Sequence, residues 1–163
     1  MDCRPFFFKK FGMFHHHSTM RIGTDAVLFA QWVDVKPFDN ALDIGTGSGV
    51  IPLILSQKGI ASVDAVELDA DSCEEARQNF EISMWKEKLK IYNEDVRVFS
   101  DNVNKKYDLI VSNPPFYASD VKPIRDKKVM ARHVSTLSFN DLLCSAKKND
   151  ERRLALCCSS AIL

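Results

Sequence analysis

Four consecutive residues, Asn113-Pro114-Pro115-Phe116, follow an apolar run at 107–112 that predicts a buried strand. The Asn113 amide oxygen and the Pro114 carbonyl are two hydrogen-bond acceptors that can converge on one planar amino group. The prolines stiffen the turn by fixing φ, and the Phe116 ring offers a flat face for stacking. The segment therefore has the chemistry to hold an aromatic amine, and a Pro-rich turn without a ligand is the alternative.

A glycine-rich segment lies upstream at 41–49, with the sequence ALDIGTGSG. A short apolar strand leads into it, and an apolar helical pattern follows. Gly45, Gly47 and Gly49 allow a ligand to approach the backbone, and the start of the helix supplies N–H donors. The spacing is G-x-G-x-G, whereas the dinucleotide fingerprint needs G-x-G-x-x-G. The pattern predicts a nucleotide site of another kind, and a glycine-rich loop without a ligand is the alternative.

Acidic residues follow the next two predicted strands. Glu67 closes the first of them and can accept hydrogen bonds from two ribose hydroxyls, with Asp69 as the second choice. Asp95 follows the second, where it is either a carboxylate that binds the amino group of an adenine or a solvated loop acid. Asp71 we assign to capping of the helix that follows.

Composition indicates one globular domain with its own core, since the chain has 163 residues, 45% of them hydrophobic and 27% charged. Lys plus Arg equals Asp plus Glu at 22 each, so net charge gives no support for nucleic-acid binding. The distribution of charge gives some support, because basic residues cluster in two places, although a solvated loop is the alternative. The clusters are Lys122, Arg125, Lys127, Lys128 and Arg132, and Arg4, Lys9 and Lys10.

The five cysteines are odd in number, scattered and without a C-x-x-C pattern. This indicates free thiols in a reducing cytoplasm, with no disulfide framework and no zinc site. The triplet at 15–17 is three histidines without an accompanying acid or thiol pattern, so we expect no metal. The run Phe6-Phe7-Phe8 is too short for a signal peptide or a membrane span. The sequence does not indicate an oligomeric state.

Strand and helix patterns alternate along the chain, which predicts an α/β fold: a Rossmann-like, doubly wound, mainly parallel sheet. Ligands bind beyond the carboxyl ends of such strands, so Gly45, Glu67, Asp95 and Asn113 are expected to line one crevice. We divide the chain into an aromatic and basic N-terminal arm, 1–24, and a domain, 25–163, whose first helix is capped by Thr24. The predicted strands are 40–44, 62–67, 88–92, 107–112 and 152–158, and the predicted helices 25–32, 49–58, 71–83 and 139–148.

Taken together, these motifs resemble class I S-adenosylmethionine-dependent methyltransferases, and among them the Asn-Pro-Pro-[Phe/Tyr] enzymes that methylate exocyclic or amide nitrogens. The chain is most similar to the bacterial tRNA1(Val) adenine methyltransferase family, which modifies the adenosine beside the anticodon. The similarity covers roughly residues 6–158. It rests on Phe8-Lys9-Lys10-Phe11, the stretch 20–28 with sequence MRIGTDAVL, Phe116, Ala131-Arg132-His133 and Leu137-Ser138-Phe139.

This resemblance implies S-adenosylmethionine as the cofactor, lying across the glycine loop, and a tRNA as the substrate. Asp43 would orient the methionine amino group, Glu67 the ribose and Asp95 the adenine of the cofactor. Asn113 and Pro114 would accept the hydrogens of the target amine. Phe116 would stack on the flipped base, and Tyr117 would line the pocket or belong to its rim or the core. Both basic clusters would bind RNA phosphates.

The resemblance also implies seven strands, whereas the sequence carries only five. We therefore expect the last two strands to be absent, the strand order to be 3-2-1-4-5, and Leu154 and Leu156 to form an exposed apolar edge. Three other functions stay open. They are methylation of a protein glutamine, methylation of a ribosomal RNA guanine, and a non-catalytic role as a truncated fragment that binds cofactor or RNA.

Overall fold

A computed structural model describes residues 4–114, Cys144 and residues 153–156. Its centre is a five-stranded sheet in the order β5-β4-β3-β6-β7, in which every pairing is parallel. The predicted fold class and the order 3-2-1-4-5 are therefore confirmed. The strands are β3 (Asn40–Ile44), β4 (Ser62–Glu67), β5 (Leu89–Asn93), β6 (Leu109–Ser112) and β7 (Leu154–Leu156).

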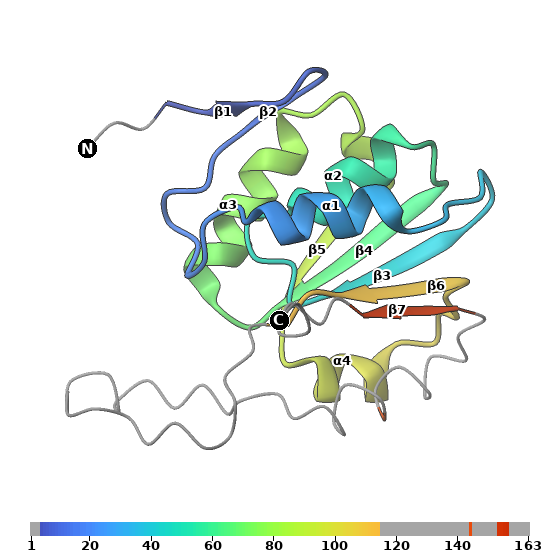
Figure 1. Ribbon diagram of the computed structural model, residues 1–163. Helices are drawn as coiled ribbons and strands as arrows, with labels where there is room; N and C mark the ends of the chain where they lie inside the picture. The colour runs from blue at the N-terminus through green and yellow to red at the C-terminus, as the bar shows by residue number, and fades with distance from the viewer. Residues whose placement is uncertain (1–3, 115–143, 145–152, 157–163) are drawn as a thin grey trace, which may run out of the picture.

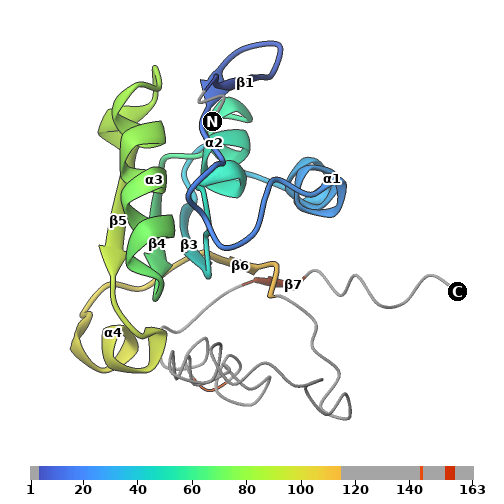
Figure 2. The ribbon, with the colours of Figure 1, turned by 90° about the vertical axis from the view of Figure 1, so that its left-hand side faces the viewer.

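Helices cover both faces of the sheet, as a doubly wound fold requires. α1 (Thr24–Trp32), α2 (Val50–Gln57) and α3 (Ala70–Glu81) lie on one face, and α4 (Val96–Asn102) lies on the other (Figure 1). The view turned by 90° shows the same two layers (Figure 2). No helix within the described ranges has both the length and the apolar character needed to span a membrane.

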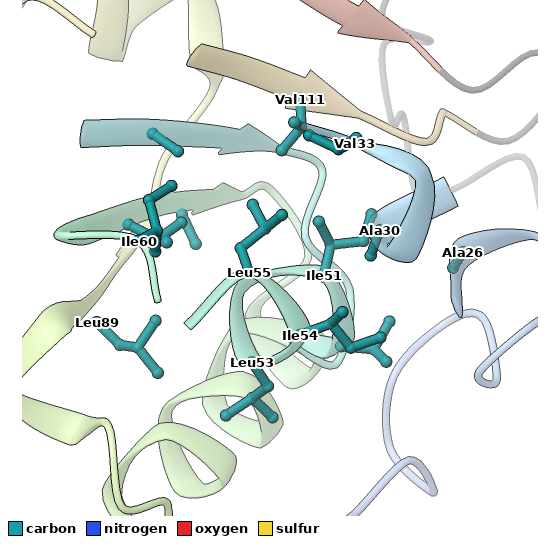
Figure 3. Packing of buried hydrophobic residues seen from close by; sticks show 14 of the residues in the cluster. Ala26, Ala30, Val33, Ile51, Leu53, Ile54, Leu55, Ile60, Leu89 and Val111 are labelled. Carbon is teal, nitrogen blue, oxygen red and sulfur yellow. The ribbon is translucent and has the colours of Figure 1, made fainter. Parts of the chain in front are cut away.

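Successive residues of a strand point to opposite faces, and this sorts the apolar side chains into two clusters. The larger cluster lies under α1, α2 and α3, and Figure 3 shows Ile51 and Ile54 of α2 beside Ala30 of α1. The smaller cluster joins Leu42 and Ile110 of the sheet to Phe99 of α4. α2 is buried all round, which explains why its sequence is apolar without a polar stripe.

The N-terminal segment packs against the domain. β1 (Phe6–Phe7) and β2 (Gly12–Met13) form an antiparallel hairpin that the sequence did not predict. Phe11 and Met13 belong to the larger core cluster. The segment that follows is hydrogen-bonded along α3, for example through Thr19 N to Ser72 Oγ at 3.0 Å.

Two predicted helix caps were wrong by one or two residues. Gly23, not Thr24, occupies the N-cap position of α1, and it makes no side-chain cap. Asp69, not Asp71, caps α3, because its Oδ2 accepts from the backbone N of Ser72 at 2.9 Å and from the Ser72 hydroxyl. In both places several adjacent polar residues suit a helix start, and tertiary packing selects among them.

Other differences concern whole elements. α4 was not predicted, since Val96, Val98 and Phe99 favour helix weakly, and Asp95 stabilises the start of α4 as its N-cap. β7 is the last strand in the sheet order, and Leu154 is partly buried against the smaller core cluster, so this residue is less exposed than we expected for the edge. The helix predicted at 139–148 lies outside the described residues apart from Cys144.

Candidate active site

Four predicted sites meet at the carboxyl edge of the sheet. The strands β5, β4, β3 and β6 are parallel neighbours in that order, so the residues after their ends lie along one edge. That order places Asp95, Glu67, the glycine loop and Asn113 side by side, as the sequence predicted. The chain runs from β3 to β4 on one side and returns to β6 on the other, and such a switch point is where ligands bind in α/β folds. We call this place the crevice.

Two of the three loop glycines border open space. Gly45 and Gly47 have φ of 72° and 57°, and a Cβ on either would meet no atom of the described residues within 4 Å. Gly49 is different, because a Cβ there would lie 2.6 Å from the Phe80 ring of α3. Gly49 is thus explained by the packing of α2 against α3, whereas Gly45 and Gly47 leave room for a ligand.

Glu67 is held by the backbone beside this loop. Its Oε2 accepts from the Gly47 N–H at 2.9 Å, and its Oε1 accepts from the Asp69 N–H at 2.9 Å. A carboxylate offers about four acceptor positions, so each oxygen keeps capacity for a further donor. Glu67 is half-buried, which leaves it reachable, whereas the Asp69 carboxylate is occupied in capping α3.

Asp43 lies beneath the loop with no exposed surface, and neither of its oxygens has a hydrogen-bond partner among the described residues. Burial raises the pKa of Asp43 to about 7. The Thr46 hydroxyl lies beside Asp43 and partly offsets this rise in pKa, although the two side chains form no hydrogen bond of normal geometry. The charge of Glu67 raises the pKa of Asp43 further. A buried carboxylate without a partner is costly, and a cationic amino group placed beside it would remove that cost.

Asn113 stands at the end of β6, next to the glycine loop. The preceding residue, Ser112, ties the two strand ends together through a 2.8 Å hydrogen bond from its hydroxyl to the Ile44 carbonyl. The Asn113 Nδ2 donates to Asp25 Oδ2 at 3.1 Å. The Oδ1 is buried and has no partner in the described part of the chain. An acceptor is thus held ready at the crevice, next to Pro114, which is partly buried.

Asp95 is the most heavily engaged of the predicted site acids. It caps α4 by accepting from the Arg97 N–H at 2.9 Å, and it pairs with the Arg97 guanidinium. The hydrogen bond from the Arg97 side chain holds the pKa of Asp95 below its ordinary value. It is therefore neither a free site acid nor a solvated loop residue, and the pairing with Arg97 was not predicted.

The structure does not bring Lys9 and Lys10 to the crevice. Both are exposed in the turn of the β1–β2 hairpin (Figure 1). The neighbouring Phe11 packs on Trp85, beyond the C-terminal end of α3, with ring centroids 5.7 Å apart. The crevice lies at the other end of α3, about 18 Å away for a helix of 12 residues. The remaining predicted residues, Phe116, Tyr117, Lys122, Arg125, Lys127, Lys128 and Arg132, lie outside the described residues.

One contact at the candidate site escaped the sequence analysis, namely the hydrogen bond between Asp25 and Asn113. The two residues are 88 positions apart, and no local pattern joins them. The available signal was that Asp25 lies within the MRIGTDAVL stretch on which the resemblance partly rests.

The chain is similar to tRNA-modifying enzymes of known name. It is 42% identical to the tRNA1(Val) (adenine(37)-N6)-methyltransferase of Trichodesmium erythraeum, over 96% of this chain and 67% of that protein. It is 39% identical to the protein of the same name from Parabacteroides distasonis, over 90% of this chain and 62% of that protein. The chain thus spans about two thirds or less of the length of these relatives.

Solved structures support the fold. The SAM-dependent methyltransferase from Agrobacterium tumefaciens superimposes with a TM-score of 0.57 at 16% identity, covering 69% of this chain and 39% of that one. The model of the methyltransferase small domain family matches residues 6–136. That range contains the glycine loop, the acids at the strand ends and the Asn-Pro-Pro-Phe turn. The chain therefore belongs to the methyltransferase small domain family.

Proposed function

We propose that this chain carries the catalytic site of an enzyme that methylates the exocyclic amine of an adenine beside the anticodon of a tRNA, in the cytoplasm, with S-adenosylmethionine as methyl donor. The names of the relatives support the substrate. The observation that carries the proposal is the buried Oδ1 of Asn113, which has no partner among the described residues and lies at the switch point beside the glycine loop.

The residues at the crevice fit S-adenosylmethionine, which supplies a methyl group activated by a sulfonium. Gly45 and Gly47 leave room above the backbone. The Asp43 carboxylate lacks a partner and would accept from the methionine ammonium group. Glu67 has acceptor capacity left for ribose hydroxyls, and Asp95 would accept from the adenine amino group with the capacity that Arg97 leaves.

Asn113 and Pro114 would hold the target amine. An adenine amino group is a poor nucleophile because its lone pair is delocalised into the ring. Two acceptors, Asn113 Oδ1 and the Pro114 carbonyl, would favour a pyramidal nitrogen with its lone pair directed away from the ring system. Catalysis then comes mainly from positioning. No base is needed before transfer, since the methylated nitrogen is strongly acidic and loses its proton afterwards.

The target base must leave its stack to reach this site. Phe116 would stack on the flipped ring, a contact worth about 1–3 kcal/mol per base, and Tyr117 would line the pocket. Lys122, Arg125, Lys127, Lys128 and Arg132 would bind phosphates of the tRNA. Lys9 and Lys10, in the arm 1–24, would contact the tRNA at a distance from the reacting base.

The test is transfer of a tritiated methyl group from S-adenosylmethionine to total tRNA, with release factor and ribosomal RNA assayed in parallel. We expect label in tRNA, recovered as N6-methyladenosine after digestion. The matched control is Asn113→Ala, which should bind the cofactor but not transfer the label. Label confined to release factor or to ribosomal RNA would replace the proposed substrate. Cofactor binding without transfer to any of them would identify a non-catalytic fragment.

A further inference from the structure

The side chain of Asn113 has two ends of opposite chemistry. Its Oδ1 accepts hydrogen bonds and its Nδ2 donates them. A half-turn about the last side-chain bond exchanges the two ends without changing the shape of the side chain. Only one orientation suits the proposed reaction. An Asn113 NH2 group directed at the substrate amine would place donor against donor, whereas the amide oxygen can accept the amine hydrogens. The protein therefore needs a feature that selects the orientation.

Asp25 provides that selection. This residue lies in the first turn of α1, and its Oδ2 accepts from Asn113 Nδ2 at 3.1 Å. An ionised carboxylate accepts hydrogen bonds and cannot donate them, so only the NH2 end of Asn113 can face it. We propose that Asp25 is a positioning residue that holds the Asn113 amide with its oxygen toward the crevice. This inference deepens the proposed function and rests on it.

The glycine before the helix supports this assignment independently. Gly23 has φ of −91° and ψ of 152°, a conformation open to any residue, so its backbone does not require glycine. A Cβ on Gly23 would lie 2.1 Å from Asp25 Oδ1, the end of a flexible side chain, so an alanine at 23 would displace the Asp25 carboxylate from its present position. The Asp25 carboxylate thus folds back over Gly23, with Oδ1 against the glycine and Oδ2 on Asn113.

The burial of Asn113 Oδ1 explains why the selection is needed. That oxygen has no partner among the described residues, so the known contact that fixes the amide is the one at Nδ2. Asp25 also stands in the first turn of a helix, where any acid stabilises the helix start. Asp71 occupies the same position in α3 and serves as the matched control, being exposed and in the first turn.

The first test needs neither cofactor nor substrate. In a 1H–15N spectrum of the labelled chain, the side-chain NH2 signals of Asn113 are identified by their loss in Asn113→Ala. We expect Asp25→Ala and Gly23→Ala to shift these signals and to speed their exchange with water, while Asp71→Asn leaves them in place. Unchanged Asn113 signals in Asp25→Ala would overturn the inference.

The second test separates positioning from binding. Asp25→Ala and Gly23→Ala should lower kcat about tenfold, consistent with loss of one charge-assisted hydrogen bond, with cofactor affinity changed by less than about twofold. Asp71→Asn should leave kcat unchanged. A loss of cofactor affinity as large as the loss of kcat would make Asp25 a cofactor ligand instead.

An exchange of the two side chains gives the sharpest result. Asn113→Asp places two carboxylates against each other, which is unfavourable. Adding Asp25→Asn restores a donor facing an acceptor, with the direction of the hydrogen bond reversed and an oxygen still directed at the crevice. We expect the double variant to be at least about fivefold more active than Asn113→Asp alone, as coupled neighbours show. If the double variant recovers no activity, the inference is contradicted.

If the unaltered chain transfers no methyl group, the proposed function fails, and the spectrum alone then decides whether Asp25 holds Asn113.

Discussion

Buried polar side chains along α3 and at the crevice differ in whether their polar atoms have hydrogen-bond partners. On α3, Glu75 accepts from the backbone N–H groups of His16, His17 and Ser18 at 2.6–2.9 Å. Asn79 on the same helix is also fully engaged, since it bonds the backbone of Phe14 and the Ser48 carbonyl. At the crevice, by contrast, buried polar atoms of Asp43, Thr46 and Asn113 lack partners among the described residues.

The unpartnered atoms are concentrated rather than scattered. Among the described residues, six buried side-chain atoms have no hydrogen-bond partner, and four of them belong to Asp43, Thr46 and Asn113. An unpartnered buried group costs about 1–3 kcal/mol. Buried groups without partners are rare in native structures, and a functional role is one explanation for them. The α3 residues stabilise the fold, and under the proposed function the crevice residues would find their missing partners in a ligand.

Two aspartates on neighbouring strands show the contrast within the sheet. Asp64 of β4 is buried and accepts from Lys105 Nζ and Tyr107 OH, each at 2.8 Å. Asp43 of β3 is as deeply buried and has neither kind of partner. The difference is position, since Asp43 lies under the glycine loop.

The largest effect is expected at Asn113. Asn113→Ala should lower the methyl-transfer rate about a hundredfold or more, by analogy with removal of one preorganised polar contact. Cofactor affinity and thermal midpoint should change little, because Oδ1 has no partner among the described residues and the lost hydrogen bond from Nδ2 to Asp25 is exposed. Single-turnover kinetics and calorimetry measure these quantities. Near-normal turnover in this variant would exclude the role of Asn113.

Glu75 should show the opposite behaviour. Glu75→Ala leaves three backbone N–H groups without their acceptor, so we expect a loss of about 3 kcal/mol in the free energy of unfolding. Urea denaturation measures it. Glu74→Ala, on the exposed side of the same helix, is the control and should leave the urea midpoint nearly unchanged. Equal stability of the two variants would remove the distinction between the two regions.

Asp43→Asn should stabilise the protein when no cofactor is present. The folded-state pKa of Asp43, about 7, lies above that of an unfolded aspartate. The folded state therefore binds the extra proton, and the original protein loses stability as pH rises from about 4 to 7. We expect the variant to be more stable by up to about 4 kcal/mol at pH 8, since each of about three pKa units is worth about 1.4 kcal/mol, and by little at pH 4. A gain that does not depend on pH would contradict this account of Asp43.

The smallest effect is expected in the hairpin. Affinity for tRNA should fall steeply with salt, as phosphate contacts require. Replacing Lys9 and Lys10 by Gln should reduce the slope of log affinity against log salt by about 1.5–2, without changing cofactor affinity. Filter binding at several salt concentrations measures this slope. An unaltered slope would remove the hairpin from the RNA-binding surface.

Local sequence patterns predicted the parallel sheet and the four strand-end motifs, and the family resemblance supplied the strand order. Alternating elements define a parallel sheet, and its carboxyl edge gathers Gly45, Glu67, Asp95 and Asn113 by topology alone. Contacts between distant residues were not predictable from those patterns. The Asp25 pairing with Asn113 and the contact of Gly49 with Phe80 depend on how helices pack, which no spacing along the chain encodes.

Local sequence patterns also do not predict the hydrogen-bond partners of buried carboxylates or the pairing of a helix-capping residue. A sequence shows that Asp43 and Asp64 lie in strands. Only the packed sheet shows that Asp64 accepts hydrogen bonds from a cation and a hydroxyl, whereas Asp43 accepts none from the described residues. Asp95 was predicted as a site residue on its position, yet its pairing with Arg97 depends on α4, whose short apolar sequence gave no helical pattern.

Calorimetric titration with S-adenosylmethionine tests the central claim, because the missing partner of Asp43 is assigned to the cofactor. The account predicts saturable binding at one site per chain, weakened about tenfold or more by Asp43→Asn, since a hydrogen bond to a charged group is lost. Absence of binding to the unaltered chain, or equal affinity in the Asp43→Asn variant, would contradict it.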